Sequence, residues 1–238
     1  MSYLDIALCS LTVLVGSTLQ GSIGFGMGLF ASPILILVDE RFVPAPILLS
    51  TWVMTTFLIF RERHAIDVGG LRWAVVGRAV GTLAAATLLM FLPRDRMPLI
   101  CGIMVLIGVA MSLSGLRFHP SRGVLVGAGA MSAVMGTVAS IGGPPIALVY
   151  QHGTGARLRA TMSSFFWIGT VMSLVVLRVM GRFGKDEVYL TLVILPGVLI
   201  GLLASHWTLA VVDRGFVRPV VLTLAAVAGL AVIVRQLI

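Results

Sequence analysis

The chain has 238 residues, of which 58% are hydrophobic and 11% are charged, and its formal net charge is +8. A soluble domain of this length cannot cover so much apolar surface, so we predict an all-α polytopic membrane protein. In a soluble protein the positive charge would suggest binding to nucleic acid. Here the arginines lie in short connections between apolar runs, so we expect them to contact anionic lipid headgroups of the membrane and expect no nucleic acid.

Eight apolar runs follow one another along the chain, separated by short polar connections. They cover residues 6–38, 43–60, 71–92, 97–116, 123–150, 158–180, 188–212 and 216–234. Most have the roughly 20 residues that a membrane-spanning helix needs. No connection is long enough to separate soluble domains, so we predict a single transmembrane domain over residues 1–238. Cys9 and Cys101 both lie in apolar runs, which argues against a disulfide framework.

The first and fifth runs are interrupted by residues that break helices. The first contains GSTLQGSIGFGMGLFASP at residues 16–33, and the fifth contains GAGAMSAVMGTVASIGGPP at residues 127–145. The first run is too long for one helix and too short for two complete ones. We therefore expect pairs of half-length helices that meet in mid-membrane, where irregular backbone is tolerated only inside protein or beside a water-filled cavity.

The same interrupted segment near the start of each half predicts internal repeats over residues 1–118 and 119–238. Each repeat would hold a broken or re-entrant first segment followed by three spanning helices. If the broken segments re-enter, each half crosses the membrane three times and the second repeat is inverted. If they span, each half crosses four times and the repeats are parallel. We favour the re-entrant, inverted arrangement.

A helix that begins in mid-membrane directs free N–H groups and a positive dipole end toward whatever lies there, so both breaks favour an anion. The alternative is that the glycines only permit close helix packing. Side chains that border the breaks, together with the backbone of each break, form our predicted substrate site. Its residues are Gln20, Ser22, Gly24, Phe25, Gly26, Ser140, Gly142, Gly143, Ile146 and Arg159.

Three charged or titratable side chains need separate interpretation. Arg159 follows the second broken segment and would either hold the anion or contact a lipid headgroup. Arg78 and His206 lie inside apolar runs, and we interpret both as snorkelling or interface-facing residues.

Several kinds of chemistry have no support in the sequence. No carboxylate occupies the middle of an apolar run, so a proton or sodium relay built on intramembrane acids is not visible. Metal-ligand spacing, a catalytic dyad and a phosphate-binding loop are also missing from the sequence. We therefore expect neither an enzyme nor a cofactor or metal site.

Five stretches, taken in order, resemble the sulfite exporter TauE/SafE family of membrane anion transporters. They are GSIGFGMGLFASPIL from residue 21, VPAPILLSTWVMTTFLIFRERHAID from residue 43, LPRDRMPLICGIMVLIG from residue 92, VLVGAGAMSAVMGTVASIGGPPIALVY from residue 124 and LRATMSSFF from residue 158. The GGPP form of the second break differs from the plainer glycine run of many members. The resemblance implies a secondary transporter of a small sulfur-containing anion, such as sulfite or an organosulfonate, in the cell inner membrane. An anion channel and a non-transporting membrane scaffold stay open as alternatives, as does a homodimer.

Overall fold

The computed structural model describes residues 2–116, 118–151, 155–212 and 217–238, and every regular element in these ranges is helical. The helices are α1 (Tyr3–Ile23), α2 (Met27–Val38), α3 (Ala45–Glu62), α4 (Val68–Phe91), α5 (Met97–Leu113), α6 (Arg122–Ala139), α7 (Gly143–Tyr150), α8 (Gly155–Val179), α9 (Lys185–Val212) and α10 (Val217–Leu237). Short 3₁₀ turns at Glu40–Phe42, Arg63–Ala65 and Arg94–Arg96 precede or follow them.

Within the described residues, seven helices are long and apolar enough to cross a membrane, and α2 is a shorter apolar helix. The protein is therefore an all-α, multi-pass membrane protein, as the composition predicts. The first residue of the eighth predicted run, at position 216, lies outside the described residues.

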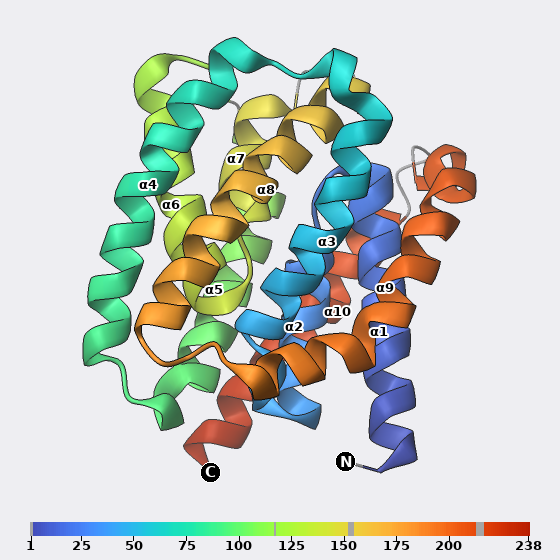
Figure 1. Cartoon of the computed structure of the whole chain (residues 1–238), viewed down its shortest axis with the longest axis vertical. Helices are drawn as coiled ribbons and strands as arrows, with labels where there is room; N and C mark the ends of the chain where they lie inside the picture. Colours follow the sequence, from blue (N-terminus) through green and yellow to red (C-terminus); the bar gives the residue numbers. More distant parts are fainter. Residues whose placement is uncertain (1, 117, 152–154, 213–216) are drawn as a thin grey trace.

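The two interrupted segments enter the bundle from opposite ends. In Figure 1, α1 rises from the end that holds both termini and α2 descends toward it, whereas α6 descends from the opposite end and α7 rises. The helix contacts of the two halves also correspond. The first helix of each half packs along the fourth helix of the other half, α1 along α9 and α6 along α4, and the equivalent helices α3 and α8 pack against each other. This pattern supports an inverted pair of repeats, which stays a prediction.

The expected half-length helices are wrong for the first member of each pair. Helix α1 has 21 residues and α6 has 18, so both are long enough to span, whereas α2 has 12 and α7 has 8. The reason is the position of the residues with positive φ. Gly24 has a φ of 98° and Gly26 a φ of 125°, so α1 ends only there, after most of the apolar run.

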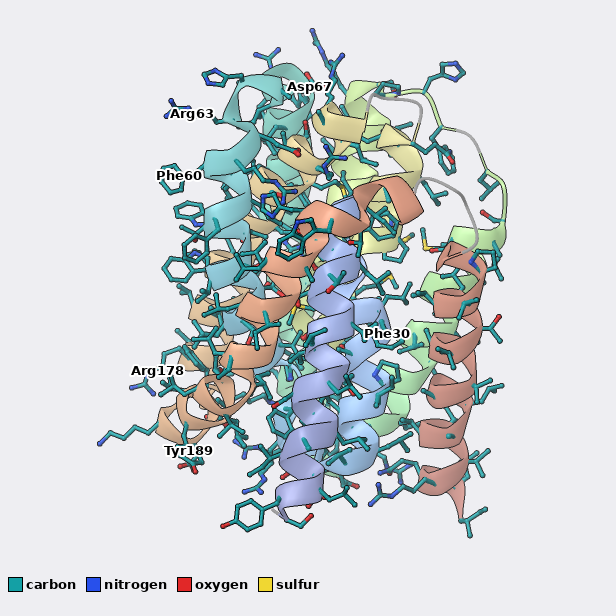
Figure 2. The ribbon with its side chains drawn as sticks, turned by 90° about the vertical axis from the view of Figure 1, so that its right-hand side faces the viewer. Phe30, Phe60, Arg63, Asp67, Arg178 and Tyr189 are labelled. Carbon is teal, nitrogen blue, oxygen red and sulfur yellow. The ribbon has the colours of Figure 1, made fainter. Side chains whose placement is uncertain are left out.

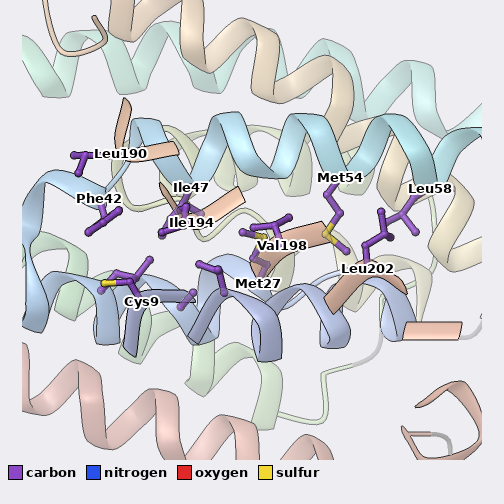
Figure 3. Packing of buried hydrophobic residues seen from close by; sticks show 13 residues of the cluster. Cys9, Met27, Phe42, Ile47, Met54, Leu58, Leu190, Ile194, Val198 and Leu202 are labelled. Carbon is purple, nitrogen blue, oxygen red and sulfur yellow. The ribbon is translucent and has the colours of Figure 1, made fainter. Parts of the chain in front are cut away.

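One apolar cluster joins the first interrupted segment to α3 and α9 (Figure 3). Its members include Met27 of α2, Met54 of α3, and Val198 and Leu202 of α9, and all four are buried. Cys9 belongs to the same cluster, and Cys9 and Cys101 are both free and buried, as expected from their places in apolar runs.

Glycines set the closest helix contacts on both sides of the bundle. A Cβ atom at Gly77 or Gly81 of α4 would collide with carbonyl groups of α6, and one at Gly197 or Gly201 of α9 would collide with carbonyl groups of α1. The interfaces α4–α6 and α9–α1 therefore depend on glycine pairs with the same four-residue spacing, as in small-residue stripes of membrane helices.

Gly136→Leu in α6 should prevent correct folding. A Cβ at Gly136 would lie 3.2 Å from a guanidinium nitrogen of Arg78 and 3.4 Å from Cα of Gly142, so a leucine has no room. Overpacking of this kind costs about 1–3 kcal/mol or more. Gly127→Leu on the same helix is the matched control, because no atom lies within 4 Å of its added Cβ. Yield and melting temperature should fall for Gly136→Leu only, and equal values for the two variants would contradict a packed site at Gly136.

Candidate functional site

The two breaks meet in the centre of the bundle. Gly28, the second residue of α2, lies so close to the Ser140 carbonyl group that a Cβ atom at position 28 would overlap it. Phe25 packs on the start of α7, since a Cβ at Gly143 would lie 2.8 Å from its ring atom Cδ2. Segments more than a hundred residues apart in the chain therefore form one contact, which the paired interruptions predict.

A small cavity of about 20 Å³ lies at this contact, and we call it the central cavity. Both breaks and helices α1, α3, α6 and α8 contribute to it. Its lining residues are Gln20, Gly26, Gly28, Leu29, Leu48, Thr51, Gly136, Ser140, Gly142, Gly143, Phe166 and Thr170. The volume corresponds to about one water molecule, so in this conformation the cavity is too small for an anion of several atoms.

Gln20 brings an unpartnered donor to the central cavity. Its side chain is 3% exposed, and no acceptor among the described residues takes a hydrogen bond from Nε2. A buried polar atom without a partner costs free energy unless a water molecule or a ligand satisfies it. Gln20 lies in the last turn of α1 because the helix continues to Ile23, where the N–H of Gly24 caps it by donating to the Gln20 carbonyl at 2.7 Å.

Hydrogen bonds to other segments fix the conformation of the second break. Ser140 takes the left-handed conformation with a φ of 63°, and its hydroxyl donates to the Pro44 carbonyl at 2.9 Å. The Ser132 hydroxyl of α6 donates to the Gly142 carbonyl. Helix α7 then begins at Gly143, and the backbone of Gly142 and Gly143 lies at the cavity, as that of Gly28 in α2 does. Pro144 and Pro145 follow and have no N–H to donate.

Five of the ten predicted site residues line the central cavity, namely Gln20, Gly26, Ser140, Gly142 and Gly143. Phe25 instead lines a neighbouring, mostly apolar pocket of about 150 Å³ that shares Gly26 and Leu29 with the cavity.

The other predicted residues have different neighbours. The Ser22 hydroxyl lies 2.9 Å from the Thr208 hydroxyl of α9 and donates to the Thr18 carbonyl. Ile146 is buried in an apolar cluster with α4 and α8. Gly24 abuts the backbone of Arg159, whose Nε donates to Glu62 Oε1 at 2.9 Å in a partly buried ion pair.

The interpretation of Arg78 as a snorkelling residue is wrong. Its side chain is 1% exposed and lies between α4, α6 and α8, while His206 is exposed as expected. Three glycines, at positions 136, 142 and 169, leave the space that the guanidinium occupies. The available signal was the charge itself, because an ionisable residue within an apolar run marks a functional site by default.

A wider hollow of about 170 Å³ opens near the end of the bundle that holds the termini, and we call it the arginine vestibule. Arg41, Arg94 and Arg182 line it together with Glu40 and Glu187. Partial burial, and then the nearby Arg94, lower the pKa of Arg182. Pro44 also lines the vestibule, so its hydrogen bond with Ser140 joins the vestibule to the wall of the central cavity.

Two ion pairs at the opposite end of the bundle join the start of α8 to the end of α3 and the start of α4. Figure 2 shows Arg63 and Asp67 at that end, with Arg178 and Tyr189 toward the other. Asp67, the N-cap residue of α4, pairs with Arg157 at 3.3 Å, and Glu62, the last residue of α3, pairs with Arg159 at 2.8 Å.

The family model described as Sulfite exporter TauE/SafE matches residues 8–232, which is nearly the whole chain. The chain belongs to the sulfite exporter TauE/SafE family. Members of the TauE/SafE family are membrane exporters and not enzymes, so transport is the general role of this protein. Comparisons with curated proteins and with solved structures found no match.

Gly28→Ala should destabilise this TauE/SafE protein by driving the two breaks apart. The added methyl group overlaps the Ser140 carbonyl, which belongs to backbone and cannot rotate away. The expected loss is about 1–3 kcal/mol, measured as a lower melting temperature in detergent. Gly127→Ala is the control, because its methyl group meets no atom within 4 Å. A Gly28→Ala protein as stable as the control would show that the breaks do not touch.

Proposed function

We propose that this protein is a secondary transporter that moves a small sulfur-containing anion, sulfite or an organosulfonate, across the cell inner membrane. The observation that carries the proposal is the unpartnered Gln20 amide in a buried cavity that both helix breaks line. The anion would occupy this cavity, with the N–H groups at the start of α2 and those of Gly142 and Gly143 at the start of α7 as its main donors.

Backbone donors suit an anion in this setting. Removing water from an oxyanion is costly unless hydrogen bonds replace it, and helix N-termini supply these bonds without a full charge in contact with lipid. The Gln20 amide would add a side-chain bond, and the Ser140 hydroxyl would add another by turning its proton from the Pro44 carbonyl to the anion. Ser22 and Ile146 would hold the ends of α1 and α7 in position, since their own contacts are with neighbouring helices.

The small volume of the cavity suits a carrier, in which substrate binding is coupled to movement of the two breaks. The volume of about 20 Å³ admits one water, whereas sulfite carries three oxygen atoms around sulfur, so binding requires the breaks to separate. In transporters with broken helices, alternating access moves one repeat against the other around such a site. The arginine vestibule would collect anions on one side, and the apolar pocket beyond Gly26 would take the carbon part of an organosulfonate.

Ligand binding should raise the melting temperature of the purified protein. We expect a rise with one or more of sulfite, sulfate, thiosulfate, taurine and sulfoacetate, because a ligand at 100 times its Kd adds about 2.7 kcal/mol of stability. No rise with any of them would favour the scaffold alternative. Conductance of single molecules in a bilayer, without one-for-one exchange in proteoliposomes, would favour the channel.

Substitution of cavity side chains should weaken binding moderately. Gln20→Ala and Ser140→Ala should each raise the Kd or the uptake KM about fivefold, since each removes one hydrogen bond worth on the order of 1 kcal/mol. Thr12→Ala is the control on α1, because its hydroxyl bonds its own helix at Leu8 and lies outside the cavity lining.

Arg159→Ala tests the alternative position for the site. In the structure Arg159 pairs with Glu62, so its removal should affect the mouth of the pathway rather than the cavity. If folded Gln20→Ala and Ser140→Ala proteins transport like wild type while Arg159→Ala alone is inactive, the anion binds at Arg159 and the central cavity is not the site.

A further inference from the structure

Arg78 is a buried cation whose charge no neighbouring carboxylate balances. Nη1 donates to the Ser132 hydroxyl at 3.2 Å and Nη2 donates to the Ser173 hydroxyl at 3.2 Å. The guanidinium also lies over the ring of Phe165, 5.2 Å from its centroid. Among the described residues, no carboxylate forms an ion pair with it, and Nε has no hydrogen-bond partner. All its contacts are therefore neutral.

The guanidinium lies directly behind the central cavity. Nη1 would be 3.1 Å from a Cβ at Gly142 and 3.3 Å from one at Gly136, and both glycines line the cavity. No side chain therefore projects from these two positions between the cation and the cavity. We call Gly136 and Gly142 the glycine wall. The interaction of a cation with a nearby anion is much stronger in a buried apolar setting than in water.

Packing alone does not require an arginine at this position. Gly77 precedes Arg78 on α4, and on α9 Gly197 makes the corresponding close approach to α1. The residue after Gly197 is Val198, which is completely buried in an apolar cluster. An apolar side chain thus fills the matching place in the other half, whereas an uncompensated buried charge is costly and is rarely kept without a role.

We propose that Arg78 makes the central cavity selective for anions, by supplying through the glycine wall the positive charge that a bound anion neutralises. This inference rests on the proposed function and adds a specificity residue to it. Arg78 does not line the cavity, so it acts on the anion by its charge and through Ser132, which holds the Gly142 carbonyl.

The test compares two probes of similar shape, the anion methanesulfonate and the neutral dimethyl sulfone, on purified protein. Wild type should bind methanesulfonate more tightly. In Arg78→Gln, the Kd for methanesulfonate should rise at least about tenfold while the Kd for dimethyl sulfone changes by less than about threefold. A purely structural arginine would weaken both probes together. A folded Arg78→Gln protein that keeps the wild-type ratio of the two Kd values overturns the proposal.

A second pair of variants leaves Arg78 in place. Ser173→Asp puts a carboxylate beside Nη2 as an internal counter-ion, and Ser173→Asn has the same size without the charge. We expect Ser173→Asp to lose at least about tenfold in methanesulfonate affinity relative to Ser173→Asn, with dimethyl sulfone unaffected. Equal methanesulfonate affinities in the two variants also overturn the proposal, and this comparison holds even if Arg78→Gln does not fold.

The two proposals fail in different ways. If wild type binds none of the anions in the melting-temperature screen nor methanesulfonate, the proposed function fails and the role of Arg78 fails with it. If wild type binds methanesulfonate and Gln20→Ala weakens that binding, but Ser173→Asp and Ser173→Asn bind it equally, the cavity is the site and only the role of Arg78 is overturned.

Discussion

The need to satisfy backbone polar groups away from water governs this structure. An unbroken helix satisfies its own N–H and C=O groups, and a break inside the bundle exposes several of them at once. The protein places two such breaks against each other, so that each is covered by the other and by four surrounding helices. The cavity between them is then lined by backbone N–H groups that have no acceptor within their own helix.

Glycine makes this arrangement possible in two distinct ways. At Gly24 and Gly26 the backbone takes positive φ values, which end α1 and start α2 without strain. At Gly28, Gly77 and Gly201 the glycines matter because a neighbouring carbonyl group occupies the place of a side chain. The same residue type therefore supplies both the break and the close packing, and the packing alternative raised from the sequence is partly correct.

The charged side chains near the two ends of the bundle differ in their surroundings from the one near its centre. Arg159 and Glu62 neutralise each other near one end, and the arginine vestibule combines three arginines with two glutamates near the other. Only Arg78, among the described residues of the bundle centre, carries a charge beside the cavity. An anion in the cavity would contact neutral hydrogen-bond donors, with the Arg78 cation behind them. Both interactions would offset the free-energy cost of removing water from the anion.

The sequence by itself determined the membrane class, the helical runs, the two interruptions and the family, because each depends on local composition or on residue order. It also pointed to Gln20, Ser140 and the glycines that line the central cavity with them, since breaks in apolar runs are visible without a structure. Helix lengths were misjudged, because the exact residue at which α1 ends depends on the φ angle that Gly24 takes in the folded chain. Only the tertiary structure decided that Arg159 pairs with Glu62, that Ser22 bonds α9, and that Arg78 lies behind the cavity. These outcomes depend on which helices pack together, and contacts between residues 54 or more positions apart leave no mark in local sequence.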